Sequence, residues 1–209
     1  MQCSIASLDE IRDNRAMPFN FPILLTWLRI LAIPFVVGVY SNAIPDGWLN
    51  MIERNWIATA LFVLAAVTDW LDGYFARRWN QTSAFGAFLD PVADKLMVCA
   101  TLLILLQMDR VESWVALIIV GREITISALR EWMAQLGAHG SVAVNWLGKI
   151  KTIAQMIALP MLLADVQLFS WFHSRQWGTW LIWVATVLTL WSMFYYLKQA
   201  LPTIRQHQS

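Results

Sequence analysis

Six long apolar runs constrain the fold of this 209-residue chain more than any other feature of its sequence. A helix needs about 20 apolar residues to cross the roughly 30 Å hydrocarbon layer of a bilayer. Each run reaches or approaches that length, so we expect six transmembrane helices. A membrane β-barrel is excluded, because its strands would appear as short segments of alternating polarity. The predicted spans are residues 23–40, 56–74, 85–107, 114–133, 147–168 and 177–197.

The composition agrees with a membrane protein. Apolar residues make up 58% of the chain and charged residues 14%, whereas soluble domains average roughly 45–50% and about 25%. A soluble domain of this size cannot bury so much apolar surface. The predicted fold class is therefore all-α, a polytopic membrane protein surrounded by membrane lipid. The net charge of +1 gives no reason to expect a nucleic-acid partner.

The chain is expected to form one domain with two short polar ends. Residues 1–20 form a polar leader without a hydrophobic signal region. This leader is either a short amphipathic helix on the membrane surface or a frayed tail. Residues 21–200 form the six-helix domain, and residues 201–209 form a tail. A structural disulfide between Cys3 and Cys99 is not expected, because one lies in the leader and the other in an apolar run.

Lys and Arg residues outside the runs or near the ends of the runs predict the orientation in the membrane. Nine of them lie in segments on the side of the N-terminus, against three on the opposite side, Arg54, Arg110 and Arg175. Cytoplasmic segments carry the excess of positive charge. Both termini and the loop between the second and third runs are therefore predicted to be cytoplasmic.

Four aspartates interrupt the second and third runs near one membrane face. Asp69 and Asp72 are three residues apart, and Asp90 and Asp94 are four apart, so each pair shares one helix face. A short connection makes the two helices antiparallel, which brings all four carboxylates to the cytoplasmic side. Such a cluster repels itself unless a cation binds, and oxygen ligands favour Mg²⁺ or Mn²⁺. Alternatively, each aspartate pairs with a base nearby in the sequence: Arg77, Arg78 or Lys95.

These aspartates belong to a longer pattern, D-x2-D-G-x2-A-R-x8-G-x3-D-x3-D, which runs from Asp69 to Asp94. Its eight fixed positions have a chance probability on the order of 10⁻⁸ in a chain of this length. The pattern resembles the signature of the CDP-alcohol phosphatidyltransferase family at every position. The resemblance implies an enzyme that transfers a phosphatidyl group from a CDP-linked lipid to an alcohol by direct displacement.

The resemblance also implies roles for the motif residues. Asp69, Asp72 and Asp90 are expected to bind metal, Mg²⁺ or Mn²⁺, with two ions in each active site. Asp94 is expected to act as the general base and to contact the second ion. The residues expected to bind CDP-diacylglycerol are Gly73, Ala76, Arg77 and Gly86. Arg77 suits a phosphate through its planar guanidinium, whereas the small residues fit close helix packing almost as well.

The acceptor alcohol is indicated by three other stretches: residues 19–29, 121–132 and 141–155. They are similar to the bacterial branch of the family that joins CDP-diacylglycerol to sn-glycerol 3-phosphate and releases CMP. This resemblance implies a homodimer in the bacterial inner membrane, with its active site on the cytoplasmic side. A cationic pocket is expected to bind the acceptor phosphate through Arg122, Arg130, Lys149 and Lys151.

Two features of this pocket leave alternatives open. Lys149 and Lys151 lie about 200° apart around a helix, so only one of them is expected to face the pocket. Arg122 lies inside a span, where it either binds substrate or pairs with an intramembrane acid, such as Glu123 of a neighbouring helix or an aspartate of the motif. Inositol phosphate would need the same cations as glycerol 3-phosphate. A third possibility is an ion-coupled transporter, because acidic pairs on facing helices also bind transported ions.

Overall fold

The computed structural model describes residues 21–41, 44–45, 47–78, 84–135, 146–169 and 171–206. Within these residues the protein has six α-helices and one short hairpin. The helices are α2 (Phe21–Val39), α3 (Met51–Arg78), α4 (Ala84–Gln107), α5 (Ser113–Gln135), α6 (Trp146–Ala164) and α7 (Ser174–Gln206). The leader of residues 1–20 and Cys3 lie outside the described residues. The all-helical class is confirmed, with one helix for each predicted run.

Several helix ends differ from the predicted bounds. Helix α3 begins at Met51 and ends at Arg78, whereas the predicted run covers residues 56–74. The fifth run was expected to continue to residue 168, but α6 ends at Ala164 and is followed by β1 (Gln167–Phe169), which pairs with β2 (Phe172–His173). Asp165 follows the helix with a φ of 46°, the left-handed conformation that commonly ends a helix. At the other end of the chain, α7 continues to Gln206, so most of the segment expected to be a tail is helical.

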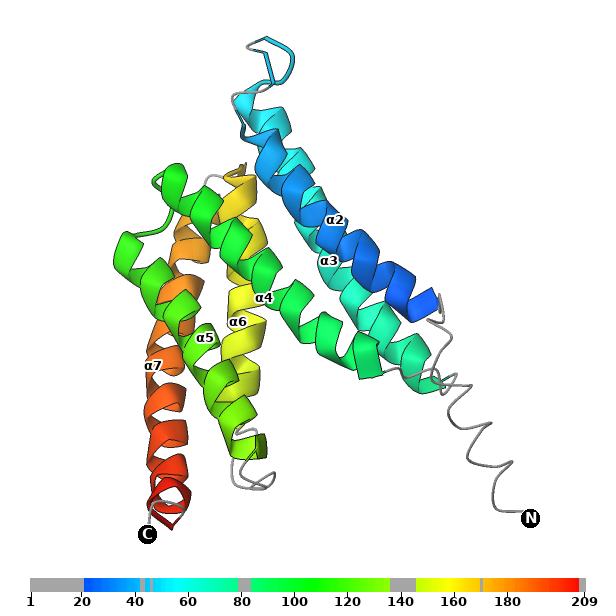
Figure 1. Cartoon of the computed structure of the whole chain (residues 1–209). Helices are drawn as coiled ribbons and strands as arrows, with labels where there is room; N and C mark the ends of the chain where they lie inside the picture. Colours follow the sequence, from blue (N-terminus) through cyan, green and yellow to red (C-terminus); the bar gives the residue numbers. More distant parts are fainter. Residues whose placement is uncertain are drawn as a thin grey trace, which may run out of the picture.

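The helices form two groups joined through α4 and α6. Helices α2 and α3 pack together on one side, and α5 and α7 on the other (Figure 1). Both α4 and α6 contact members of each group. The end of α3, the start of α4, the end of α5 and the start of α6 all lie at the lower end of the bundle in Figure 1. This is the end that the Lys and Arg count assigns to the cytoplasm.

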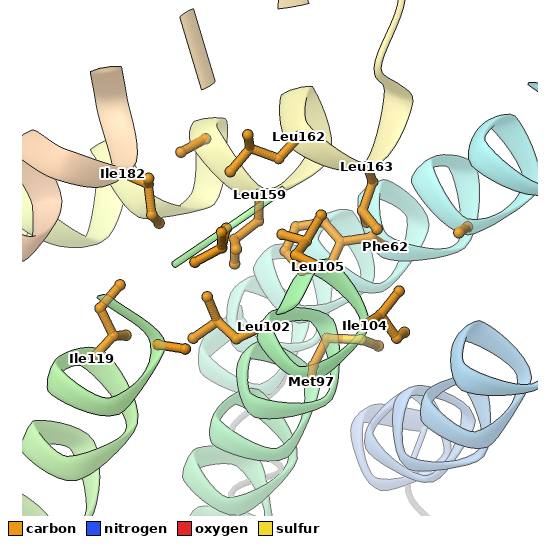
Figure 2. Close-up of a cluster of buried hydrophobic side chains, with 14 of the residues drawn as sticks. Phe62, Met97, Leu102, Ile104, Leu105, Ile119, Leu159, Leu162, Leu163 and Ile182 are labelled. Atoms are coloured by element: carbon orange, nitrogen blue, oxygen red, sulfur yellow. The ribbon is translucent and has the colours of Figure 1, made fainter. Parts of the chain in front are cut away.

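An apolar core fills the space between the helices. Its largest fully buried members include Phe62 from α3, Leu102 and Leu105 from α4, and Leu159 and Leu162 from α6. Figure 2 shows these side chains meeting from facing helices, with Ile119 of α5 and Ile182 of α7 at the edge of the cluster. The core therefore holds α4 and α6 at the centre of the bundle.

Polar side chains fix helix ends at the face opposite the predicted cytoplasmic side. At the start of α3, the Asn50 side chain accepts a hydrogen bond from the backbone of Glu53, and the Glu53 carboxylate accepts one from the backbone of Asn50, both at 2.9 Å. This reciprocal pair is a capping box. Nearby, Arg54 donates to the Val39 carbonyl at the end of α2, at 3.2 Å. Arg175 donates to the Asp109 carbonyl beyond α4, at 2.8 Å.

Buried Arg110 ties three elements together at the same face. Its Nη1 donates to the carbonyls of Leu162 and Leu163 at 3.0 and 2.7 Å, near the end of α6. Its Nη2 donates to the Asn55 side chain at 3.1 Å and forms an ion pair with Asp165 at 3.2 Å. A guanidinium at a helix C-terminus satisfies free carbonyls and complements the helix dipole. This clamp explains why α6 ends earlier than its apolar run.

The exterior of the bundle is rich in exposed apolar side chains, among them Trp180 and Phe194 of α7 and Leu117 of α5. Among the described residues, two helices are long and apolar enough to cross a membrane, at Met51–Leu71 and Ser174–Lys198. A shorter apolar segment covers Leu24–Val39. Length and composition therefore identify two of the six predicted spans. Helices α4, α5 and α6 contain the charged residues of the cavity described next, and charge lowers hydropathy.

Candidate functional site

A cavity of about 390 Å³ opens between the helices, and all six of them contribute to its walls. Its charged lining falls into two groups. The first comes from α2, α3 and α4 and consists of Arg29, Asp69, Asp94 and Lys95. The second comes from α5 and α6 and consists of Arg122, Glu123, Arg130 and Lys151. The cavity thus brings motif aspartates from one part of the sequence together with predicted phosphate-binding cations from another.

Arg29 joins two of the motif aspartates. Its Nη1 lies 2.7 Å from Oδ1 of Asp69 on α3 and 2.7 Å from Oδ1 of Asp94 on α4. The Arg29 side chain is only 2% exposed, whereas the two carboxylates are 38% and 50% exposed. In the part of the chain that the structure describes, the base that pairs with these two aspartates is therefore Arg29 of α2, and the side chain of Arg77 lies outside that part.

The same face of α2 contacts a third aspartate. The Thr26 hydroxyl donates a hydrogen bond to Oδ1 of Asp90 at 2.7 Å, and Thr26 precedes Arg29 by one helical turn. Sequence reasoning did not assign either residue to the site. A signal was present, because an arginine inside an apolar run rarely lacks a specific partner.

Several motif residues lie partly outside what the structure describes. The backbones of Asp72, Ala76 and Arg77 belong to α3, but their side chains are outside the described part. Gly73 is half-buried on α3, and Gly86 is buried on α4. The predicted roles of these residues, binding of CDP-diacylglycerol and, for Asp72, of metal, remain predictions.

The donor atoms around Asp69 and Asp94 suit a hard cation. Their Oδ1 atoms approach one nitrogen of Arg29, so they lie no farther apart than twice 2.7 Å. Carboxylate oxygens are the ligands that Mg²⁺ and Mn²⁺ prefer, and in this structure Arg29 supplies the positive charge between these two. Among the side chains that the structure describes, no group of three or more His, Cys, Asp or Glu residues gathers closely enough to hold a metal ion. A complete ligand set therefore needs further donors, and Asp72 is the nearest candidate in the sequence.

The second charged group centres on one carboxylate oxygen. Arg122 Nη1 donates to Oε1 of Glu123 at 3.0 Å, and Lys151 Nζ donates to the same oxygen. Both cations are buried. Within the described part of the chain, Nε of Arg122 is buried without a hydrogen-bond partner. The ion pair considered as an alternative for Arg122 is thus present, but with Glu123 of the same helix, and it leaves one donor unused.

The remaining predicted cations differ in their placement. Lys151 is 2% exposed and lines the cavity, whereas Lys149 is exposed at the surface. This is the arrangement that their angular separation around α6 predicts. Arg130 lines the cavity, and its Cζ lies 5.9 Å from the ring centre of Tyr196 on α7. Sequence reasoning missed Tyr196, because α7 contributes little to the resemblance.

Comparisons with known proteins identify the family of this chain. The family model of CDP-alcohol phosphatidyltransferases matches residues 19–191. The chain is similar to the CDP-diacylglycerol–glycerol-3-phosphate 3-phosphatidyltransferases of Escherichia coli (strain K12) and Salmonella typhimurium (strain LT2). In both cases 49% of 188 aligned residues are identical, covering 88% of this chain and 96% of the relative. The chain therefore belongs to the CDP-alcohol phosphatidyltransferase family.

Proposed function

We propose that this protein transfers a phosphatidyl group from CDP-diacylglycerol to sn-glycerol 3-phosphate in phospholipid biosynthesis. The products are phosphatidylglycerophosphate and CMP. The observation that carries the proposal is that Asp69 and Asp94 line the same cavity as Arg122, Arg130 and Lys151. Further support comes from relatives named for this activity at 49% identity.

On the donor side, the motif residues bind the CDP-linked lipid. Enzymes of this family generally depend on a divalent metal, and two ions held by Asp69, Asp72, Asp90 and Asp94 would neutralise the pyrophosphate and the departing CMP. Arg77 binds a phosphate through two parallel hydrogen bonds. Gly73, Ala76 and Gly86 leave room for the nucleotide close to α3 and α4.

On the acceptor side, Asp94 takes the proton from the attacking hydroxyl of glycerol 3-phosphate. The alcohol oxygen then forms a bond to the lipid-side phosphorus, and the bond from that phosphorus to CMP breaks. Arg122, Arg130 and Lys151 bind the acceptor phosphate and hold the hydroxyl in line. Lys149, which lies at the surface, extends toward lipid headgroups instead.

The membrane arrangement completes the proposal. All six helices cross the bacterial inner membrane, with both termini and the cavity on the cytoplasmic side, and two chains form a homodimer. Support for the membrane comes from the apolar exterior and from the nine-to-three distribution of Lys and Arg. A cytoplasmic opening gives a water-soluble acceptor access to a donor whose acyl chains stay in the bilayer.

Product analysis tests the proposed reaction directly. The purified protein receives CDP-diacylglycerol and Mg²⁺ with glycerol 3-phosphate, inositol phosphate and serine offered together. We expect CMP and phosphatidylglycerophosphate. A phosphatidylinositol phosphate product would keep the family reaction and change the acceptor. No release of CMP with any alcohol would contradict the reaction and favour transport.

A further inference from the structure

Among the side chains that the structure describes, Tyr196 is the bulkiest of the fully buried ones, at 1% exposure, although it lies on a helix with many exposed aromatic rings. Phe194, two residues earlier on α7, is 71% exposed. Tyr196 instead faces inward and contributes to the cavity wall. The ring is therefore buried because it lines the cavity, and not because α7 is apolar in general.

Two arginines of the cavity approach this ring. The Cζ atoms of Arg122 and Arg130 lie 6.0 and 5.9 Å from the ring centre of Tyr196. The two arginines are eight residues apart on α5, which is slightly more than two turns, so they share one face of that helix. The ring of Tyr196 therefore connects two cations that lie roughly 12 Å apart along the helix axis.

Apolar residues hold the ring in this place. Ile126, Leu129 and Met133 of α5 pack with Tyr196 in a separate buried cluster. A cation near an aromatic face is attracted to the ring, most strongly when both are removed from water. The ring thus offers both guanidinium groups, that of buried Arg122 and that of exposed Arg130, an attractive neighbour that does not occupy their hydrogen-bond donors. This agrees with the Nε of Arg122, which donates to none of the described groups.

We propose that Tyr196 is a positioning residue for the acceptor phosphate. Its ring orients Arg122 and Arg130 toward the cavity and leaves their N–H groups available to the phosphate. This inference rests on the proposed function, because it assigns the two arginines to the acceptor. It adds α7 to the acceptor site, which the motif and the other resembling stretches do not include.

Two substitutions separate the ring from the hydroxyl. Tyr196→Phe keeps the ring, whereas Tyr196→Leu removes it and keeps an apolar side chain. The purified variants are compared with the wild type by the KM for each substrate, kcat and competitive inhibition by inorganic phosphate. We expect the KM for glycerol 3-phosphate and the inhibition constant of phosphate to rise on the order of 10-fold in Tyr196→Leu. Both should stay within about threefold of wild type in Tyr196→Phe.

The KM for CDP-diacylglycerol should not change in either variant. Phe194→Leu is the matched control, because it removes an exposed ring from the same helix and should behave as wild type. Equal losses for Phe and Leu at position 196 would assign the effect to the hydroxyl and overturn the proposal. So would a Leu variant that weakens both substrates together.

Folding is measured by size-exclusion chromatography and thermal unfolding. If Tyr196→Leu does not fold, Tyr196→Met replaces it, and failure of both would make the ring a packing element and overturn the proposal. The wild-type product identifies the acceptor separately. A wild-type enzyme that does not use glycerol 3-phosphate would therefore contradict the proposed function, whatever the variants show.

Discussion

Arg29 places one buried nitrogen between carboxylates from two helices. Replacing it by Met should destabilise the metal-free protein, because Asp69 and Asp94 would lose a shared countercharge. The loss should be about 1–3 kcal/mol, less than for a fully buried pair, since both carboxylates are partly exposed. We expect the melting temperature in chelator to fall by several degrees. Mn²⁺ should restore part of the loss, because it supplies positive charge to the same oxygens.

Arg78→Met is the control for this experiment. It removes the same charge from an exposed position on α3 and should leave the melting temperature nearly unchanged. An Arg29→Met protein as stable as wild type in chelator would show that the ion pairs contribute nothing to the fold.

The proposed roles of Asp94 and Asp69 make different kinetic predictions. Asp94→Asn should bind CDP-diacylglycerol and metal almost normally but turn over at least about 10²-fold more slowly, the scale of a lost general base. Asp69→Asn should lose metal affinity and regain part of its activity at high Mg²⁺ or Mn²⁺. Steady-state kinetics across a metal titration measures both effects. Metal rescue of Asp94→Asn alone would reverse the two roles.

Lys151 and Lys149 offer a matched pair of substitutions on α6. Lys151→Met should raise the KM for glycerol 3-phosphate and lower kcat/KM about 10–150-fold, the range for losing a hydrogen bond to a charged group. Lys149→Met should behave as wild type, because its side chain is exposed outside the cavity. Similar kinetic losses in both variants would mean that general positive charge, rather than a bound phosphate, explains the effect.

At the scale of helices, the contact between α6 and α7 depends on a glycine. A Cβ atom at Gly178 would lie 2.9 Å from Cγ of Leu162 and 3.2 Å from its backbone nitrogen. Gly178→Ala should therefore destabilise the protein by forcing the two helices apart, at a cost of roughly 1–3 kcal/mol. Gly38→Ala in α2 is the control, because nothing lies within 4 Å of its Cβ position.

The two alanine variants should change thermal stability in opposite directions. Gly38→Ala should stabilise α2 by about 0.4–1 kcal/mol, because alanine lowers the conformational entropy of the unfolded chain. Thermal unfolding in one detergent compares both variants with wild type. A stable Gly178→Ala protein would show that α6 and α7 can separate without loss.

Sequence patterns predicted the helices well because each depends on local information. A long apolar run predicts a helix at its place in the chain, although the helix can extend beyond the run, as α3 does from Met51 to Arg78. The end of α6 depended instead on Arg110, which contacts Leu162 and Asp165 from more than 50 residues away. The hairpin after α6 was also missed, because its strands contain only three and two residues, too few for an alternating pattern to be recognised.

The residues of the site also differ in this way: some could be predicted from the local sequence, and others depend on contacts between distant parts of the chain. Asp69 and Asp94 were found because the motif fixes their spacing along the chain. Arg29 and Tyr196 were missed because their roles arise only when α2 and α7 pack against the other helices. The placement of Lys149 and Lys151 could be predicted in part. Helical geometry predicted that only one would face the cavity, and packing determined which one.

At the scale of the whole molecule, labelling of single cysteines can test the predicted orientation in the membrane directly. In a variant with Cys3 and Cys99 replaced by Ser, single cysteines are placed at Trp48 and Gln81. Trp48 is exposed between α2 and α3, at the end predicted to face outward. An impermeant maleimide should label Trp48→Cys in intact cells, and Gln81→Cys only after the membrane is opened. Labelling of Gln81→Cys in intact cells would invert the predicted topology.

The shared oxygen of Glu123 has a further consequence for the choice of acceptor. Arg122, Arg130 and Lys151 together carry three positive charges, and Glu123 removes one. These four residues therefore have a formal net charge of +2, equal and opposite to that of a phosphate monoester above its second pKa of about 6. A bound dianion would neutralise these residues, whereas an alcohol without phosphate, such as serine, would leave their excess charge uncompensated, although Arg122 and Lys151 are buried. Because of Glu123, the net charge of these residues is equal and opposite to that of one phosphate monoester.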